Sequence, residues 1–552
     1  MVDIKTQIEK ILGRAVTASN VDICDYQCNA AFAIAKERGA KPYDIAREIA
    51  DKFNATDHTR RAASAHAHPS GFVNFVVTDT AITEFADMVL KTKKLPLAKQ
   101  TPRTIYFDYG SPNIAKPLHV GHLRSPIIGE ALKRVFSAFG HKCIAENYLG
   151  DWGLPMGLVI AQLYDDGLVK NDVLTTGVRA ENLNEIYPKA SARNKTDKKF
   201  ADRAADITAK LQKKTEPFYG IWQKIREISV DNIQKSYAVL NCKFDIIGGE
   251  SRATEHVPTV IEIMKKHGAH ESDGCLIIDV STPADTAPMP PVILQKQNGG
   301  DLYATSDIAS IYDRIKKYKP AEIIYCVDFR QELHLEQVFR AVKIAGIAEN
   351  TKFTHVSYGT MNGKDGKPFK TRSGDTVRLD DVFALVTEAA AKRMQKPNEN
   401  TARTVGLAAL KFGDLINSVR RDYVFDIEKF TAFEGKTGAY LLYTIARINA
   451  VLKKSGKDTG HGDQKSPTQL SPLVRAVYAA TMKLTDAFTT AIENYTLNAV
   501  ADAAWAVANK FNLLYAAETI AGNATNTKAA QVTRTALCFA LDILAIDTVD
   551  EM

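Results

Sequence analysis

The sequence lacks the features that mark secreted, disulfide-stabilised or membrane-spanning proteins. Its seven cysteines are an odd number scattered along 552 residues, and the one close pair, Cys24 and Cys28, has no second pair to complete a zinc site. No apolar run approaches the ~20 residues of a membrane-spanning helix. The opening segment MVDIKTQIEKILG is amphipathic and has no apolar signal core. We therefore expect reduced thiols, a cytoplasmic location and no contact with a membrane.

Charge of one sign is not in large excess either. The formal net charge is +7, and 45% of the residues are apolar and 24% charged, a composition typical of globular proteins. A mild positive balance attracts a polyanion only where the basic groups share a face, and it more often reflects a solvated surface. Composition therefore leaves a nucleic-acid partner open. The length predicts more than one domain.

The spacing of apolar residues predicts an α/β fold with three domains. Residues 1–100 form a predicted small α+β domain that ends in the linker KTKKLPLAKQTPRT. Residues 101–400 show the order strand, loop, helix, strand, which is typical of a Rossmann-type parallel sheet, with further strands in EIIYCVDF and FTHVSYG and a charged helical insertion at about 165–245. Residues 401–552 are predicted to be all-helical, interrupted by the polar loop SGKDTGHGDQKSP.

The loop SPNIAKPLHVGH, which follows the first strand of the predicted sheet, is the most informative segment. His119 and His122 share a face at i and i+3 near a helix N-terminus, where phosphate binds well. Gly121 allows a purine or phosphate to approach the backbone, and Lys116 adds a fixed positive charge. Such a set can stabilise charge developing on an α-phosphate. The alternatives are a surface pair or part of a metal site; no third ligand has suitable spacing, so we expect no protein-bound metal.

The segments around this loop carry a family resemblance. HVGH, preceded by SPNIAKP and followed by LRSPIIG, is similar to the HIGH motif of class I aminoacyl-tRNA synthetases in its arginyl form. DYQCNAAFAIAK resembles the appended amino-terminal domain of the bacterial-type arginyl-tRNA synthetases, so the resemblance covers essentially the whole chain. The other similar stretches follow in the family's order: NYLGDWG, FDIIGGES, DLYATSDIA, DFRQELHLEQ, THVSYG, GKPFKTRSGDTVRL and GAYLLYTIARI.

The resemblance implies a reaction and its partners. ATP, accompanied by Mg²⁺, would activate L-arginine to arginyl-adenylate, and the arginyl group would pass to the terminal ribose of tRNA(Arg) without a covalent enzyme intermediate. The amino-terminal domain would contact the tRNA elbow and the carboxy-terminal helices the anticodon. Adenylate formation would require bound tRNA. We expect a monomer.

The resemblance also assigns the arginine site. It implies that Asp108, Tyr303 and Asp307 bind the guanidinium, a planar group best recognised by carboxylates. Tyr303 and Asp307 are one helical turn apart and would face one pocket. Taken without the family, Asp307 reads as a helix-start acid and Tyr303 as a core aromatic residue. Asn113 and Gln331 match positions that hold the α-amino group, although Gln331 could equally be a solvated helix residue.

The substrate's carboxylate and ATP have their own expected contacts. His119 is placed to meet the carboxylate of the amino acid. The residues expected to bind ATP are Gly121, His122, His355, Gly359, Met361 and Lys367.

NGKDGKPFKTRSG resembles the second motif of the class, the KMSKS motif, in which Lys370 and Arg372 would act with Lys367 on the departing pyrophosphate. The family's second loop lysine has no plain counterpart here, and we expect Lys116 to replace its charge. A Gly/Lys-rich solvated turn is the alternative reading of this segment.

The expected tRNA contacts lie on one carboxy-terminal helix. Tyr440, Tyr443 and Arg447 could stack on splayed bases, although the same spacing describes a core stripe. Two rival functions remain at this point. One is a synthetase of the same class for another amino acid, disfavoured by the acids Asp108 and Asp307. The other is a catalytically silent tRNA-binding relative, disfavoured by the intact HVGH loop.

Overall fold

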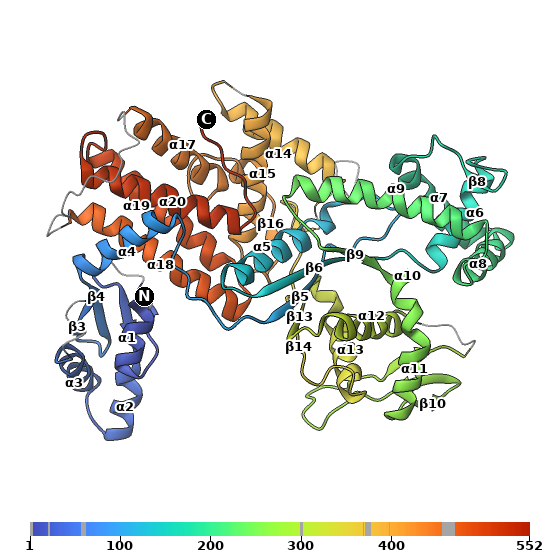
Figure 1. Cartoon of the computed structure of the whole chain (residues 1–552), viewed down its shortest axis with the longest axis horizontal. Helices are drawn as coiled ribbons and strands as arrows, with labels where there is room; N and C mark the ends of the chain where they lie inside the picture. Colours follow the sequence, from blue (N-terminus) through green and yellow to red (C-terminus); the bar gives the residue numbers. More distant parts are fainter. Residues whose placement is uncertain are drawn as a thin grey trace. The chain divides into compact units, whose positions relative to one another are not determined.

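The computed structural model describes residues 4–19, 23–56, 62–297, 302–367, 369, 377–396, 398–454 and 470–552. The chain divides into two compact units (Figure 1). One, which we call the sheet unit, comprises Thr101–Leu385 and Val419–Asp426. The other, the terminal unit, comprises Met1–Gln100, Val386–Ser418 and Ile427–Met552.

A five-stranded parallel sheet organises the sheet unit, as predicted for a Rossmann-type fold. Its strands, in spatial order, are β14 (Lys352–His355), β13 (Glu322–Cys326), β5 (Thr104–Tyr109), β6 (Lys142–Leu149) and β9 (Ile246–Gly249). The central strand β5 is buried on both faces, which explains its unbroken run of apolar and aromatic residues. Strand β13 is shorter than predicted, because the chain turns into the 3-10 helix η3 (Phe329–Gln331).

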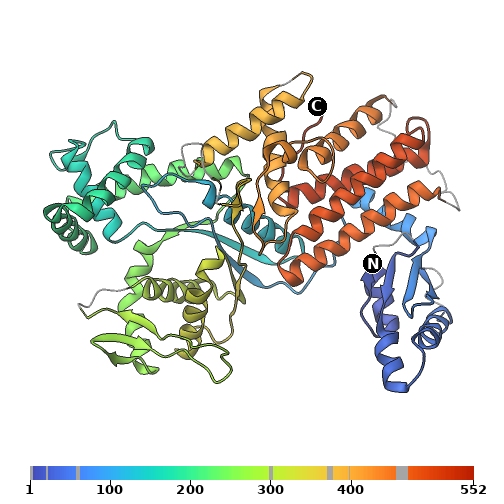
Figure 2. The same ribbon diagram turned by 180° about the vertical axis from the view of Figure 1, so that it is seen from behind.

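Helices cover both faces of this sheet. On one face α5 (Arg124–Ala138) packs through Phe136, whose ring meets Phe107 of β5 edge to face at 5.6 Å. On the other, α12 (Tyr303–Tyr318) and α13 (Glu332–Ile344) share a core with Tyr106 of β5. Both views show α5 and the α12–α13 pair on opposite sides of the sheet (Figures 1 and 2). The alternation of Tyr106 and Phe107 along β5 thus anchors both helical layers.

The sheet unit also contains a group of helices and a small antiparallel sheet. The region expected as a helical insertion contains α7 (Ala180–Thr196), α8 (Lys198–Gln212) and α9 (Phe218–Val239), which pack with α6 (Leu154–Asp165). We did not predict a three-stranded antiparallel sheet of β10 (His270–Ser272), β11 (Cys275–Ile278) and β12 (Val292–Gln295). Its first hairpin turns at Asp273-Gly274 with φ of 48° and 75°, a two-residue turn for which Asp-Gly is the usual signal.

The terminal unit combines a small sheet with a helical bundle. The sheet is antiparallel, and its strands in spatial order are β1 (Thr17–Ala18), β2 (Tyr26–Cys28), β4 (Val73–Val77) and β3 (Ala63–Ala67). Strand β4 falls within the predicted strand GFVNFVV. Helix α4 (Asp79–Thr92) packs on the carboxy-terminal helices α18 (Pro472–Asn494) and α20 (Ala524–Ile543). The remaining long helices of this unit are α15 (Glu399–Leu415), α17 (Gly438–Lys454) and α19 (Asn498–Ala517), together with the part of α14 (Leu379–Arg393) from Val386 onward. None of the helices described is both long and apolar enough to cross a membrane.

Candidate active site

The HVGH loop leaves the carboxyl end of β5 and enters the 3-10 helix η1 (Val120–His122), which leads into α5. His119 caps η1: its Nδ1 accepts the backbone N–H of Gly121 at 3.1 Å, and its own backbone N–H donates to Nδ1 of His122 at 3.1 Å. The centroids of the two imidazoles are 4.0 Å apart. The structure therefore brings His119 and His122 together, as their spacing predicted.

Both imidazoles are neutral in this arrangement. Burial lowers the pKa of His122 to about 3, and the charge of Lys116 and the neighbouring His119 contribute. Burial and Lys116 also lower the pKa of His119. Because each Nδ1 accepts a backbone N–H, each ring carries its proton on Nε2. Two Nε2–H donors are therefore available to an anion, and Lys116 supplies the fixed charge beside them.

Gly121 and Lys116 have partners that the sequence did not reveal. A Cβ at Gly121 would lie 2.8 Å from Cε1 of His119, so a side chain there would displace the imidazole. The glycine thus makes room for the His119 ring, in addition to exposing its own backbone. Lys116 Nζ lies 4.2 Å from the ring centroid of Tyr187 on α7, a cation–π contact that restrains the ammonium.

Asp108, which we expected to bind the substrate guanidinium, instead has an internal partner. Its carboxylate is buried and accepts from Nη2 of Arg314 at 2.6 Å and from Oγ of Ser111 at 2.9 Å. Arg314, on α12, also donates through Nε to Glu146 at 2.8 Å and through Nη1 to the hydroxyl of Tyr325 at 2.9 Å. A guanidinium does meet Asp108, but it belongs to the protein. The contact of Asp108 with the substrate stays a prediction, which now has to accommodate this internal ion pair.

Glu250, which the sequence analysis did not single out, supplies an acid in this region. It begins the short helix α10 (Glu250–Ala253) directly after β9, at the carboxyl edge of the sheet where ligands bind in such folds. Burial, with the charges of Asp151 and Asp307, raises the pKa of Glu250 to about 7. The charge of Glu250 also contributes to the raised pKa of Tyr303. Glu250, Tyr303 and Asp307 are thus close enough to act on one another electrostatically.

The negative charge of Asp151, the third acid of this cluster, is already compensated by an ion pair with Arg226. Asp151 is fully buried and accepts from Nε of Arg226 at 2.7 Å and from the backbone N–H and hydroxyl of Ser251, each at 2.9 Å. Glu250 accepts a backbone N–H of Trp152, and no cationic side chain of the described residues pairs with it. Among the described residues, Glu250 is therefore an acid with a raised pKa and no cationic partner, and its carboxylate is available to a ligand.

Asp307 lies one turn after Tyr303 on α12, as predicted, and has a partner that we did not foresee. Its Oδ2 accepts from Nε2 of His334 on α13 at 2.6 Å. This hydrogen bond raises the pKa of His334. Tyr303 is 69% exposed, so it is not the core aromatic residue of the alternative reading. The buried hydroxyl of Tyr148 has no hydrogen-bond partner in the described part of the chain, and the charges of Asp307 and Glu250 contribute to its raised pKa.

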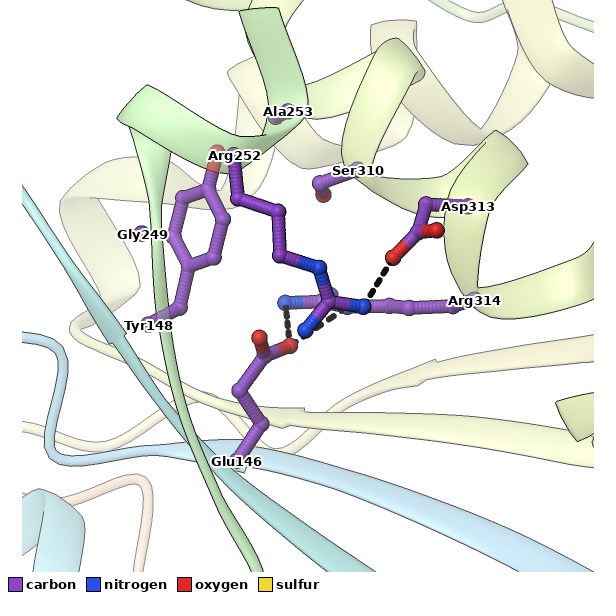
Figure 3. A pocket seen from close by; sticks show the side chains of 8 residues that line it. All are labelled: Glu146, Tyr148, Gly249, Arg252, Ala253, Ser310, Asp313 and Arg314. Atoms are coloured by element: carbon purple, nitrogen blue, oxygen red, sulfur yellow. Dashed lines mark hydrogen bonds and ion pairs between the residues drawn. The ribbon is translucent and has the colours of Figure 1, made fainter. Parts of the chain in front are cut away.

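The helices that carry Glu250 and Asp307 are tied together by an ion pair. Arg252 of α10 donates to Asp313 of α12, and His256 lies 3.2 Å from the other oxygen of that carboxylate. Figure 3 shows Arg252 and Asp313 at a small polar cavity beside Tyr148 and the Arg314–Glu146 pair. This pair fixes α10 against α12 and so helps to set the separation of the two acids.

The two residues expected at the α-amino group lie at exposed positions. Asn113 forms an isolated parallel bridge with Gly150, and a Cβ at Gly150 would fall 1.9 Å from the Asn113 amide oxygen. Gly150 therefore allows this close approach. Gln331 ends η3 immediately before α13 and is exposed. Neither side chain is buried in the core, so both are available to a ligand.

The three residues expected at adenine lie at the end of β14 and in the segment that follows it. His355 donates through Nε2 to the carbonyl of Val327 at 3.0 Å, and burial lowers its pKa. A Cβ on Gly359 would lie 2.6 Å from the carbonyl carbon of Arg421, so the chain approaches too closely for any other residue. Met361 is buried in β15 (Met361–Asn362), which pairs with β16 (Tyr423–Val424). The packing in this region therefore depends on Gly359.

The loop that resembles the second class motif is described only in part. Lys367 is exposed, and its backbone carbonyl accepts the N–H of Gly363 at 2.7 Å in a turn. Lys370 and Arg372 lie outside the described residues. Within the described ranges, no group of three or more His, Cys, Asp or Glu side chains could hold a metal ion.

The three residues expected at tRNA form part of a polar and aromatic cluster between α17 and α19. The guanidinium of Arg447 lies 4.7 Å from the ring centroid of Tyr443 and 4.8 Å from that of Tyr515. Asn512 accepts from Arg447 and donates to the hydroxyl of Tyr440 at 2.9 Å. Tyr443 and Tyr515 are 39% and 38% exposed, so the cluster is open to solvent and is not a core stripe.

Comparison with known protein families covers all of these regions. Residues 84–427 match the family described as tRNA synthetases class I (R), catalytic domain. Residues 3–77 match the arginyl tRNA synthetase N terminal domain, and residues 441–552 match the DALR anticodon binding domain. The catalytic match alone spans more than half of the chain and contains the whole candidate site.

Individual relatives agree with these matches. The arginine–tRNA ligase of Alkaliphilus oremlandii is 38% identical over 526 residues, covering 92% of this chain and 89% of that protein. That of Francisella tularensis subsp. tularensis is 35% identical over 547 residues, covering 96% and 92%. The crystal structure of Plasmodium falciparum arginyl-tRNA synthetase has the same fold, with a TM-score of 0.82 at 22% identity over the full length of both chains. The chain belongs to the arginyl-tRNA synthetase family of class I synthetases.

Proposed function

We propose that the chain ligates L-arginine to tRNA(Arg) at the expense of ATP. The carboxylate of arginine attacks the α-phosphorus of ATP, pyrophosphate leaves, and arginyl-adenylate forms. A hydroxyl of the terminal ribose of the tRNA then attacks the carbonyl carbon, and AMP leaves. Both steps depend on positioning and on stabilisation of developing negative charge.

The observation that carries this proposal is the pair of acids Glu250 and Asp307 beside the exposed phenol of Tyr303. A guanidinium offers five N–H donors in a plane and one positive charge, which suits two carboxylates and a hydroxyl. Glu250 has no cationic partner among the described residues, and its pKa of about 7 reports a buried acid that a bound cation would keep ionised. A neutral amino acid would leave this acid buried and uncompensated, which disfavours a synthetase for an uncharged substrate.

The HVGH loop provides the chemistry at the phosphate. We place the substrate's α-amino group at Asn113 and Gln331 and its carboxylate at His119. The neutral Nε2–H groups of His119 and His122 would donate to oxygens of the α-phosphate as negative charge develops there, and Lys116 would add its charge. Neutral donors need no proton transfer to act, so this stabilisation persists across the physiological pH range.

ATP is bound, in this proposal, by the strand ends on the other side of the loop. Adenine would lie at His355, Gly359 and Met361, and the ribose and phosphates near Gly121 and His122. Lys367 would act on the departing pyrophosphate together with Lys370 and Arg372, which lie outside the described residues. Magnesium enters bound to the phosphates of ATP, as part of the substrate.

The partners follow from the same assignment. We propose that residues 401–552 bind the anticodon and that Tyr440, Tyr443 and Arg447 form part of that surface, because their cluster presents aromatic faces and a guanidinium to solvent. Residues 1–100 would contact the tRNA elbow, and residues 101–400 would hold the catalytic site. We further propose a cytoplasmic monomer whose adenylate formation requires bound tRNA.

The test is an exchange assay between labelled pyrophosphate and ATP. We expect exchange only when L-arginine and tRNA(Arg) are both present, because the amino acid and the tRNA each complete the site. Exchange supported by another amino acid would overturn the substrate assignment. No exchange with any amino acid, in a preparation that still binds tRNA, would favour a catalytically silent relative.

A further inference from the structure

The ion pair of His334 and Asp307 occupies the carboxylate that the proposed function gives to the substrate. The two side chains come from different helices, α13 and α12, and the Nε2–Oδ2 distance is 2.6 Å. Their side chains are 30% and 32% exposed, so the pair lies at the edge of the protein and not in its core. A ligand with a positive charge would therefore reach a carboxylate that already has a cationic neighbour.

The two carboxylate oxygens of Asp307 can serve two different partners, His334 and the substrate. His334 uses Oδ2 of Asp307, and no hydrogen bond or ion pair to Oδ1 is present among the described residues. One oxygen is thus open to a guanidinium while the imidazole stays in place. The imidazole does not have to move, but its second positive charge would repel the arriving one.

Asp307 is the group that sets the charge of His334. The hydrogen bond and the negative charge of Asp307 together raise the pKa of His334, against the opposing effect of burial. None of the other ionisable groups on the elements packed around α13 contributes to that shift. Those groups are Glu332, Glu336, Arg340 and Lys343 on α13, Arg330 on η3, Lys352 and His355 on β14, and Tyr303, Tyr312, Asp313, Arg314, Lys316, Lys317 and Tyr318 on α12.

We propose that His334 is the internal counter-cation of Asp307 in the unliganded protein, and that binding of L-arginine expels one proton from this imidazole. The proton leaves from Nδ1 to solvent, and Nε2–H remains bonded to Oδ2 of Asp307. The neutral imidazole then still orients the carboxylate, while the guanidinium supplies the positive charge. His334 is a positioning residue for the substrate and does not take part in the chemical steps.

Repulsion between the imidazolium and the arriving guanidinium favours this exchange, because both cations would lie at the carboxylate of Asp307. With His334 protonated, Glu250 and Asp307 would face two cations, the imidazolium and the guanidinium. With His334 neutral, two carboxylates meet one guanidinium and the phenol of Tyr303. Arginine affinity should therefore fall as pH falls through the pKa of free His334, and it should be independent of this group above that pKa.

Calorimetry of L-arginine binding to the full chain tests this inference, which rests on the proposed function. Titrations in two buffers of different ionisation enthalpy at about pH 7 give the number of protons released on binding. We expect the wild type to release up to about one proton more than His334→Gln, since glutamine keeps the donor to Asp307 but cannot titrate. Protons released by Glu250 or by the ligand are common to both proteins and cancel in the difference.

A second variant, His334→Lys, keeps a positive charge beside Asp307 at every pH of the experiment. His334→Lys should bind arginine at about pH 8.5 at least several-fold more weakly than the wild type, because its cation cannot leave Asp307. The exposed His267, at the end of α11 (Val257–Lys266), offers a matched control, and His267→Gln should release as many protons as the wild type. Equal proton release by His334→Gln and the wild type would overturn the inference. Failure of the wild type to bind arginine would instead overturn the proposed function and, with it, this inference.

Discussion

The guanidinium of Arg314 binds the carboxylates of Asp108 and Glu146 at once, with its Nη2 2.6 Å from an oxygen of each. All three side chains are buried, and the cluster joins strands β5 and β6 to helix α12. Because β5 leads into the HVGH loop and α12 carries Asp307, this cluster links the two halves of the proposed site. The cluster therefore holds β5, β6 and α12 together.

Replacing Arg314 with methionine should therefore destabilise the protein strongly. Two buried carboxylates would lose their cation, and leaving a buried charge uncompensated costs roughly 3–5 kcal/mol. Denaturant unfolding followed by circular dichroism measures the loss. The matched control is Arg38→Met, which breaks an ion pair to Glu48 whose side chains are 62% and 63% exposed and should change stability little. Similar losses in the two variants would show that Arg314 does not have this role.

His122→Ala should lower the rate of arginine activation by roughly 10²-fold or more, because it removes a neutral donor from the developing charge on the α-phosphate. The arginine KM should change far less, since His122 does not contact the amino acid in our assignment. Pyrophosphate exchange at saturating arginine and tRNA measures the rate. An unaltered exchange rate would exclude His122 from the catalytic step.

The arginine KM should rise as the pH falls below about 7, which is the pKa to which burial and the neighbouring acids raise Glu250. Arginine binds the ionised carboxylate, so a protonated Glu250 must lose its proton, whereas above this pKa the cost disappears. Initial rates of exchange between about pH 6 and about pH 8.5 give the profile. A KM that is constant or that falls on acidification would contradict the acidic pocket.

Tyr443→Leu should raise the KM for tRNA by roughly tenfold, because base–aromatic stacking contributes about 1–3 kcal/mol per base. The arginine KM at saturating tRNA should stay close to that of the wild type. Aminoacylation kinetics with the tRNA concentration varied provide the measurement. Wild-type tRNA kinetics in this variant would remove Tyr443 from the proposed anticodon surface.

The sequence predicts the parts of this molecule that depend on local spacing. The ring centroids of His119 and His122 lie 4.0 Å apart, and Tyr303 and Asp307 lie one turn apart on α12. Both relationships follow from the spacing of residues along a helical turn. The order of strand, loop, helix and strand likewise specifies the parallel sheet. These predictions require no knowledge of distant partners.

Long-range pairing is what the sequence could not predict. The resemblance implies a substrate contact for Asp108, and nothing near Asp108 in the chain reveals its ion pair with Arg314, which lies 206 residues away. Glu250 was overlooked for a related reason: its pKa of about 7 arises from burial and from acids brought together only by the fold. Glu250 directly follows the Gly-Gly pair of FDIIGGES, where β9 ends in the structure, and the carboxyl edge of a parallel sheet is where ligands bind.

The central claim, that Glu250 and Asp307 select a cationic side chain, is tested most directly by comparing arginine with citrulline, which replaces the guanidinium with a neutral urea group of similar shape. The measurement is the ratio of kcat/KM for the two amino acids in pyrophosphate exchange, in the wild type and in Glu250→Gln. We predict a strong wild-type preference for arginine that drops by roughly 10- to 100-fold in the variant, because a charge-assisted contact is lost. An unchanged ratio would contradict the account.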